Sequence, residues 1–233
     1  MSKIIKIKAR QIIDSRGNPT IEAEVFSKNI SSSSICPSGA STGTFEAYEK
    51  RDKNRKEYNG KSVFNAVKII NTIIAKKLKN QNVHNQEKID HILLKLDGTK
   101  QKLKLGANSM LAVSMAVKKL SSKIKKIPLY KNFLVKKNFS LPYPLMNIIN
   151  GGAHANNALQ IQEFMIRPDG AKSFTQAIKM CFLVINNLRK ILKNMKLSTS
   201  VGDEGGFAPM ISSNNQALDL IVSAIKKSGF ING

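Results

Sequence analysis

Three loops of this 233-residue chain gather side chains that could do chemistry. They span residues 37–43, 150–157 and 202–209, and each combines glycine with hydroxyl, amide, imidazole or carboxylate groups. Together they offer proton donors and acceptors beside backbone that a small anion can approach closely. The three loops therefore predict a site for a small anionic substrate that uses acid–base chemistry.

The first loop, residues 37–43, places Ser41 among small residues. This composition permits close backbone approach and motion, as in a closing lid or a cradle for an anion. Taken alone, an ordinary surface loop is the simpler interpretation.

The second loop follows a short apolar run, which is where ligands bind in α/β folds. His154 lies in its Gly- and Asn-rich sequence, and Gln162 and Glu163 follow a few residues later. A single histidine is often structural, but its position after a buried strand keeps a binding role open. Glu163 opens an apolar strand, where partial desolvation suits a carboxyl group to proton transfer.

The third loop holds Asp203 and Glu204 between glycines. Two adjacent carboxylates repel each other, and either a metal ion or a retained proton would relieve that cost. The alternative is an exposed acidic turn. Because the chain has only 15 acidic residues, their pairing here favours the functional interpretation.

The elements that position these loops begin with a sheet. Residues 3–13 and 20–26 alternate apolar and charged side chains, which is the pattern of half-buried strands. The charges are mainly basic in the first segment and acidic in the second, which suits antiparallel pairing. Turn residues at 14–19 separate them, and a third strand at 30–36 completes a three-stranded meander.

Helical periodicity follows the meander. Helices are predicted near residues 61–79, 86–95 and 107–123, with a shorter segment at 129–135. A Pro-rich stretch then separates these helical segments from the short apolar runs that follow. We therefore predict an α+β N-terminal domain over residues 1–138 and a second domain over residues 139–233.

The second domain opens with apolar runs at 144–150 and 163–166, which are typical of buried strands. A long helix capped by Ser173 follows, and Gly229 ends the last helix. That last helix carries an apolar face of Leu218, Ile221, Val222 and Ile225. Short strands followed by helices predict the first part of a parallel TIM-like barrel. The barrel is incomplete, because a full one needs roughly 250 residues.

The formal charge of +23 comes from 38 Lys and Arg against 15 Asp and Glu. A basic chain can bind nucleic acid, but only six of these residues are Arg, which base reading favours. Codon bias toward Lys, Asn and Ile is the simpler explanation, and a nucleic-acid-binding protein is the less favoured alternative. No apolar run approaches the ~20 residues that cross a bilayer, and two distant cysteines indicate reduced thiols in a cytoplasm.

Read jointly, several segments closely resemble the enolase (phosphopyruvate hydratase) family, in family order and spacing. The matching segments are residues 14–20, 37–43, 96–99, 106–108, 146–152, His154, 162–165 and 202–209. The resemblance implies an α+β capping domain followed by the opening of a modified TIM-like barrel. It further implies 2-phosphoglycerate as the substrate, Mg²⁺ as the cofactor and a homodimer.

The resemblance also implies roles for individual residues. Glu204 corresponds to the general acid that assists loss of the C3 hydroxyl, and Glu163 to a neighbouring carboxyl that hydrogen-bonds in the same site. Gln162 and His154 correspond to substrate contacts. Ser41 corresponds to a loop residue that binds the second Mg²⁺ when the lid closes. The physical need is positive charge beside the proton-transfer groups, because removal of a proton next to a carboxylate builds a dianion.

The chain is a little over half the length typical of the family. We expect the principal magnesium ligands and the lysine that takes the C2 proton to lie outside it. Two hypotheses follow. The chain is an enolase whose remaining half is supplied elsewhere, or it is a catalytically inactive enolase fragment.

Overall fold

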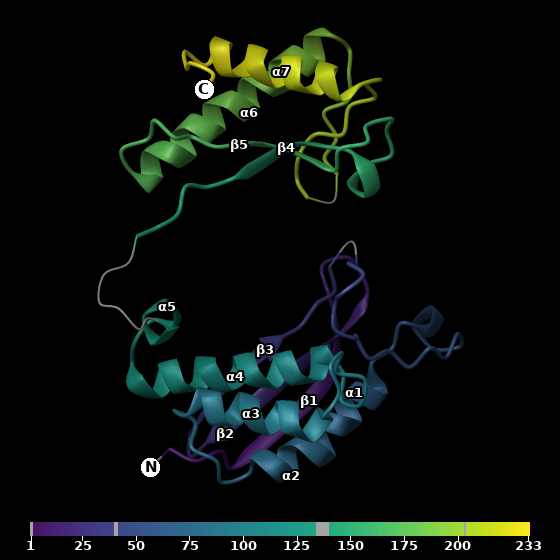
Figure 1. The fold of residues 1–233 in the computed structure, drawn as a ribbon, viewed down its shortest axis with the longest axis vertical. Helices are drawn as coiled ribbons and strands as arrows, with labels where there is room; N and C mark the ends of the chain where they lie inside the picture. The colour runs from purple at the N-terminus through teal and green to yellow at the C-terminus, as the bar shows by residue number, and fades with distance from the viewer. Residues whose placement is uncertain (1, 40–41, 134–139, 203) are drawn as a thin grey trace. The chain divides into compact units, whose positions relative to one another are not determined.

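The computed structural model describes residues 2–39, 42–133, 140–202 and 204–233 (Figure 1). The chain divides into two compact units, Met1–Lys137 and Asn138–Gly233. Each unit has its own cluster of buried apolar side chains.

The N-terminal unit contains the predicted antiparallel meander. Its strands β1 (Lys6–Ile13), β2 (Pro19–Ser27) and β3 (Ile30–Ile35) pair in chain order. The predicted cross-strand charges meet at Arg10, whose guanidinium lies 2.6 Å from Glu22 and 2.9 Å from a Glu24 oxygen. The expectation of a basic strand beside an acidic one is therefore confirmed.

Helices cover this sheet, and the predicted helical segments are confirmed as far as the structure describes them; residues 134–135 of the last segment lie outside the described residues. They are α1 (Phe64–Ile69), a π-helical turn (Ile70–Ile74), α2 (Ala75–Leu78), α3 (Gln86–Asp97), α4 (Ala107–Lys125) and α5 (Leu129–Phe133). Helix α4 packs against β2 and β3. Its Val113, Val117 and Leu120 are fully buried in one core with Ile21 and Val25 of the sheet.

Asp97, the last residue of α3, is a fully buried carboxylate in this unit. It accepts hydrogen bonds from the Leu105 amide (2.7 Å), the Thr99 amide (3.0 Å) and the Thr99 hydroxyl. Burial raises the pKa of Asp97, but these hydrogen bonds outweigh burial and hold the pKa below its ordinary value of 3.8. A lowered folded-state pKa contributes stability above 3.8, and this stability is lost as the pH falls through the folded-state pKa.

We expect Asp97→Asn to lower the free energy of unfolding of the N-terminal unit by about 2 kcal/mol at neutral pH, because hydrogen bonds to an ionised acceptor are lost. The loss should shrink at a pH below 3.8, where the wild-type carboxyl also begins to protonate. Hydrogen exchange of core amides in β2 and α4 at both pH values measures this change in the free energy of unfolding. The exposed Glu57→Gln is the control, and an equal loss at both pH values would contradict the prediction.

The C-terminal unit begins with strands β4 (Met146–Asn150) and β5 (Glu163–Ile166). They pair antiparallel, so the expected parallel arrangement is wrong for this pair. The connection between them contains only the short 3₁₀ turn Gly152–His154, whereas a parallel crossover usually needs a helix. One parallel bridge does form, between Ile149 of β4 and Phe207.

Two helices, α6 (Phe174–Asn194) and α7 (Asn214–Lys227), follow the strands and pack together. The predicted cap is confirmed, since the Ser173 hydroxyl oxygen accepts a hydrogen bond from the backbone N–H of Gln176. Gly229 adopts the left-handed conformation expected at a helix end (φ 78°). The buried face of α7 differs from the prediction, because Leu218 is exposed and Leu220 is buried instead.

The described strands of this unit do not close into a barrel; they form an α/β unit with two strands in its sheet. A search of the described helices finds none with the length and apolar character needed to cross a membrane.

Candidate active site

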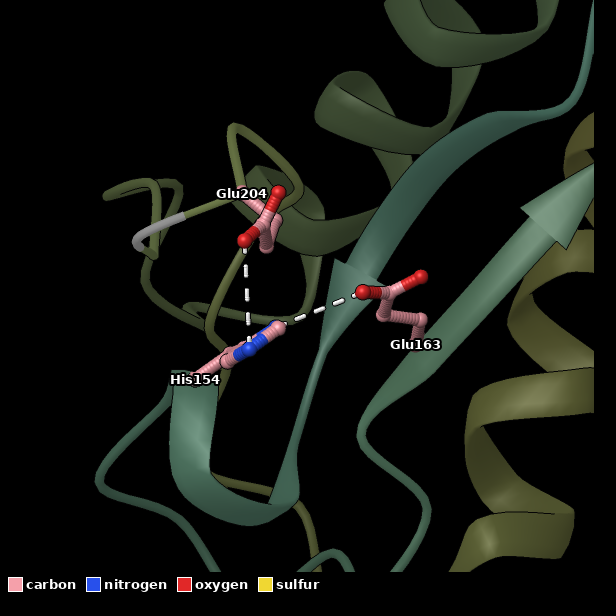
Figure 2. A group of neighbouring side chains, drawn as sticks. All are labelled: His154, Glu163 and Glu204. Atoms are coloured by element: carbon pink, nitrogen blue, oxygen red, sulfur yellow. Dashed lines mark ion pairs between the residues drawn. The ribbon is translucent and has the colours of Figure 1, made fainter. Parts of the chain in front are cut away.

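Four predicted site residues meet at one end of the β4–β5 pair. Asn150, the last residue of β4, lies opposite Glu163, the first residue of β5, and Gln162 precedes it. The 3₁₀ turn after β4 supplies His154, and the loop after α6 supplies Glu204. Figure 2 shows the imidazole of His154 linked by an ion-pair line to each of the two carboxylates.

The imidazole of His154 is the centre of the group, and its side chain is only 3% exposed. Its Nε2 lies 2.9 Å from Gln162 Nε2 and 3.8 Å from Glu204 Oε1. Its Nδ1 lies 3.5 Å from Glu163 Oε1. The structure therefore brings His154, Gln162, Glu163 and Glu204 together, while Ser41 lies outside the described residues.

The hydrogen bond with Gln162 fixes the ring of His154. As its amide is oriented, Gln162 donates to Nε2, which places the proton of a neutral ring on Nδ1, toward Glu163. Within the described residues, the buried Nδ1 has no hydrogen-bond partner, because 3.5 Å to Glu163 is too long. The ring thus presents an acceptor nitrogen on the side of Glu204.

The two carboxylates differ in access to solvent. The side chain of Glu204 is 45% exposed and that of Glu163 is 28% exposed. Glu204 is therefore the carboxyl that an entering substrate can reach more easily. A positioned carboxyl within reach of a substrate oxygen can act as a general acid or base.

The loop that carries Glu204 is tight and rich in glycine. We call its described residues, Gly202 and 204–206, the glycine loop; Asp203 of the predicted acidic pair lies outside the described residues. The Gly202 amide donates to the Gly206 carbonyl (2.9 Å), and the Gly205 amide donates to the Gly202 carbonyl (3.1 Å). Gly205 has a φ of 82°, a conformation that favours glycine. The turn is thereby closed on itself, with Glu204 within it.

Two asparagines support the site, and the sequence interpretation did not single them out. Asn150 is fully buried, and its backbone carbonyl accepts from Asn157 Nδ2 at 2.9 Å. Asn157 Nδ2 also reaches the Pro209 carbonyl at 3.2 Å, so it ties the second loop to the third. The sequence feature that could have identified Asn150 is its amide side chain at the end of an apolar strand, directly before two glycines.

An α+β unit is thus followed by a two-stranded α/β unit that carries a His–Glu–Glu group, which is a candidate acid–base site. The enolase N-terminal domain model matches residues 4–133, and the enolase C-terminal TIM barrel domain model matches residues 138–232. The chain belongs to the enolase family.

Proteins named enolase are similar along the chain. The relative from Pelagibacter ubique is 70% identical over 233 residues, which is all of this chain and 56% of the relative. Relatives from Ehrlichia canis and Methanococcus maripaludis are 52% and 50% identical over 97% of this chain and 54% of their own lengths. The chain thus spans about half the length of the curated relatives it matches.

Membership of this family implies a divalent metal ion. Among the described residues, one group could hold such an ion, namely His154, Glu163 and Glu204, whose possible ligand atoms lie within 4.8 Å of one another. Mg²⁺ prefers an octahedron of oxygen ligands, whereas the buried centre of this group is an imidazole. The group therefore does not fit Mg²⁺.

Proposed function

We propose that this chain contributes the proton-donating side of a site that reversibly dehydrates 2-phosphoglycerate to phosphoenolpyruvate. The observation behind the proposal is the position of Glu204, 3.8 Å from the buried His154 in a chain of the enolase family. Loss of a hydroxyl group from C3 requires a proton, and Glu204 is the more accessible of the two carboxyls.

The other residues bind and orient the substrate in this proposal. Gln162 and His154 are its polar contacts, and their mutual hydrogen bond limits the number of positions they can take. Glu163 lies on the Nδ1 side of the ring, and in this proposal its carboxylate accepts a hydrogen bond from the substrate. This division leaves Glu204 to exchange the proton.

Mg²⁺ remains the predicted cofactor, with Ser41 as a predicted ligand of the second ion. Both are proposed on the resemblance to the family. A homodimeric state remains a prediction on the same ground, and a cytoplasmic location remains a prediction from the two separated cysteines.

The test is a chimera in which this chain replaces the matched region of the Pelagibacter ubique relative. We expect the chimera to convert 2-phosphoglycerate in the presence of Mg²⁺, as followed by the absorbance of phosphoenolpyruvate. Their 70% identity makes a folded hybrid reasonable. A folded chimera with no turnover, beside an active intact relative, would contradict the proposal.

The same assay on this chain alone addresses the alternative, a catalytically inactive enolase fragment. We expect no turnover above background, because the proposed C2 base and principal magnesium ligands belong to the unmatched half of the family. Turnover comparable to that of the chimera would show that the chain supplies a base of its own.

A further inference from the structure

The Asn150 side chain is in contact with the glycine loop on two sides. A Cβ atom on Gly206 would lie 2.5 Å from Asn150 Oδ1, and one on Gly202 would collide with Asn150 Nδ2. The same added Cβ atom on Gly202 would lie 2.5 Å from the His154 carbonyl oxygen. The loop that carries Glu204 therefore closes directly around the Asn150 amide and beside the His154 backbone.

The backbone of Asn150 holds the end of the same loop. Its amide donates to the Phe207 carbonyl (2.8 Å), and the Phe207 amide donates to the Ile148 carbonyl (2.9 Å). Asn150 also pairs with Glu163 across the β4–β5 ladder. One buried residue thus adjoins the segments that carry Glu163, His154 and Glu204.

The polar side chain of Asn150 lies in a buried position, where an unpaired polar atom lowers the stability of the fold. Asn147 donates to its Oδ1 at 2.5 Å, but its buried Nδ2 has no hydrogen-bond partner within the described residues. An unsatisfied buried donor destabilises the folded state. The contacts of Asn150 with Gly202 and Gly206 point to a positional role that goes beyond stability.

We propose that Asn150 is a positioning residue, whose side chain sets the place of the glycine loop and so holds Glu204 against His154. Asn150 does not itself exchange a proton or bind the substrate. The inference deepens the proposed function, because it explains how the proton donor of that site is held.

The first test reads the site in the full chain without any turnover. The chain has three histidines, His84, His91 and His154, so their imidazole ¹⁵N resonances can be separated. We expect Asn150→Ala to shift the His154 resonances in the same direction as Glu204→Gln does, and to leave those of His84 and His91 unchanged.

A matched control is Asn187→Ala. Asn187 is an asparagine of the same unit, and its Nδ2 donates to Ser228 Oγ at 2.9 Å between α6 and α7. This variant should leave the His154 resonances in place. An Asn150→Ala protein that keeps the wild-type His154 spectrum, or an Asn187→Ala protein that shifts it equally, would overturn the proposal.

The second test uses the chimera. We expect Asn150→Ala to lower turnover at least tenfold when Glu204 is present, and less than about threefold in the Glu204→Gln background, since interacting residues give non-additive effects. Equal losses in both backgrounds would mean a merely structural role and would overturn the proposal. An inactive chimera would count against the proposed function alone, because the resonance test does not depend on turnover.

Discussion

Glu204→Gln in the chimera should reduce the turnover of 2-phosphoglycerate about 10²–10⁴-fold, the range typical for loss of a general acid. Glutamine keeps the length of the side chain and its contact with His154, but it cannot deliver a proton. The loss should therefore fall mainly on kcat, with a smaller change in KM, because an interaction used in the transition state is removed. Steady-state kinetics at saturating Mg²⁺ measures both constants.

The control for this substitution is Asp219→Asn. It removes an exposed carboxylate from α7 of the same unit and should leave the kinetics unchanged. Glu163→Gln provides the decisive comparison, since Glu163 faces the other nitrogen of the same ring. A larger loss of kcat for Glu163→Gln than for Glu204→Gln would reverse the two carboxyl assignments.

The N-terminal unit was predictable because its sequence patterns are local. The alternation in β1 and β2 places small and branched apolar residues such as Ala23 and Val25 on one face, where they are fully buried. The opposite charges of Arg10 and Glu22 then meet across the strands. Period and charge predicted this antiparallel pairing without knowledge of distant contacts.

The C-terminal unit shows what local patterns do not determine. An apolar run such as residues 146–150 predicts a buried strand but not the direction of its partner, which here is antiparallel. In α7, apolar residues cover a wide arc, and packing against α6 buries Leu220 while Leu218 faces outward. Direction and face both depend on contacts between elements that are distant in sequence.

The site likewise contains residues that the sequence could predict and one, Asn150, whose role it could not. Acid–base chemistry is typical of the residue types of His154, Glu163 and Glu204, so the sequence alone predicted them as site residues. Asn150 acts through its contacts with Gly202 and Gly206, more than fifty residues later in the chain. The structure is needed to see that Gly202 and Gly206 are required by their close approach to Asn150, and not by turn conformation alone.

Gly206→Ala should displace the glycine loop and disrupt the site, although it adds only one methyl group. The new Cβ would lie 2.5 Å from Asn150 Oδ1 and 2.9 Å from backbone atoms of Ile148 and Ile149. Backbone in a paired strand cannot yield as the end of a flexible side chain can, so the glycine loop must move. Such overpacking costs about 1–3 kcal/mol.

Hydrogen exchange of two amides locates this effect, namely those of Asn150 and Phe207, whose hydrogen bonds join β4 to the glycine loop. Their exchange should accelerate roughly 5- to 150-fold, the equivalent of that cost in free energy, and turnover of the chimera should fall with it. Gly170→Ala is the matched control, because a Cβ atom there meets nothing within 4 Å. If Gly206→Ala leaves both amides protected and Glu204 as effective as before, the glycine loop is not held by close contact with β4, and the position of Glu204 needs another cause.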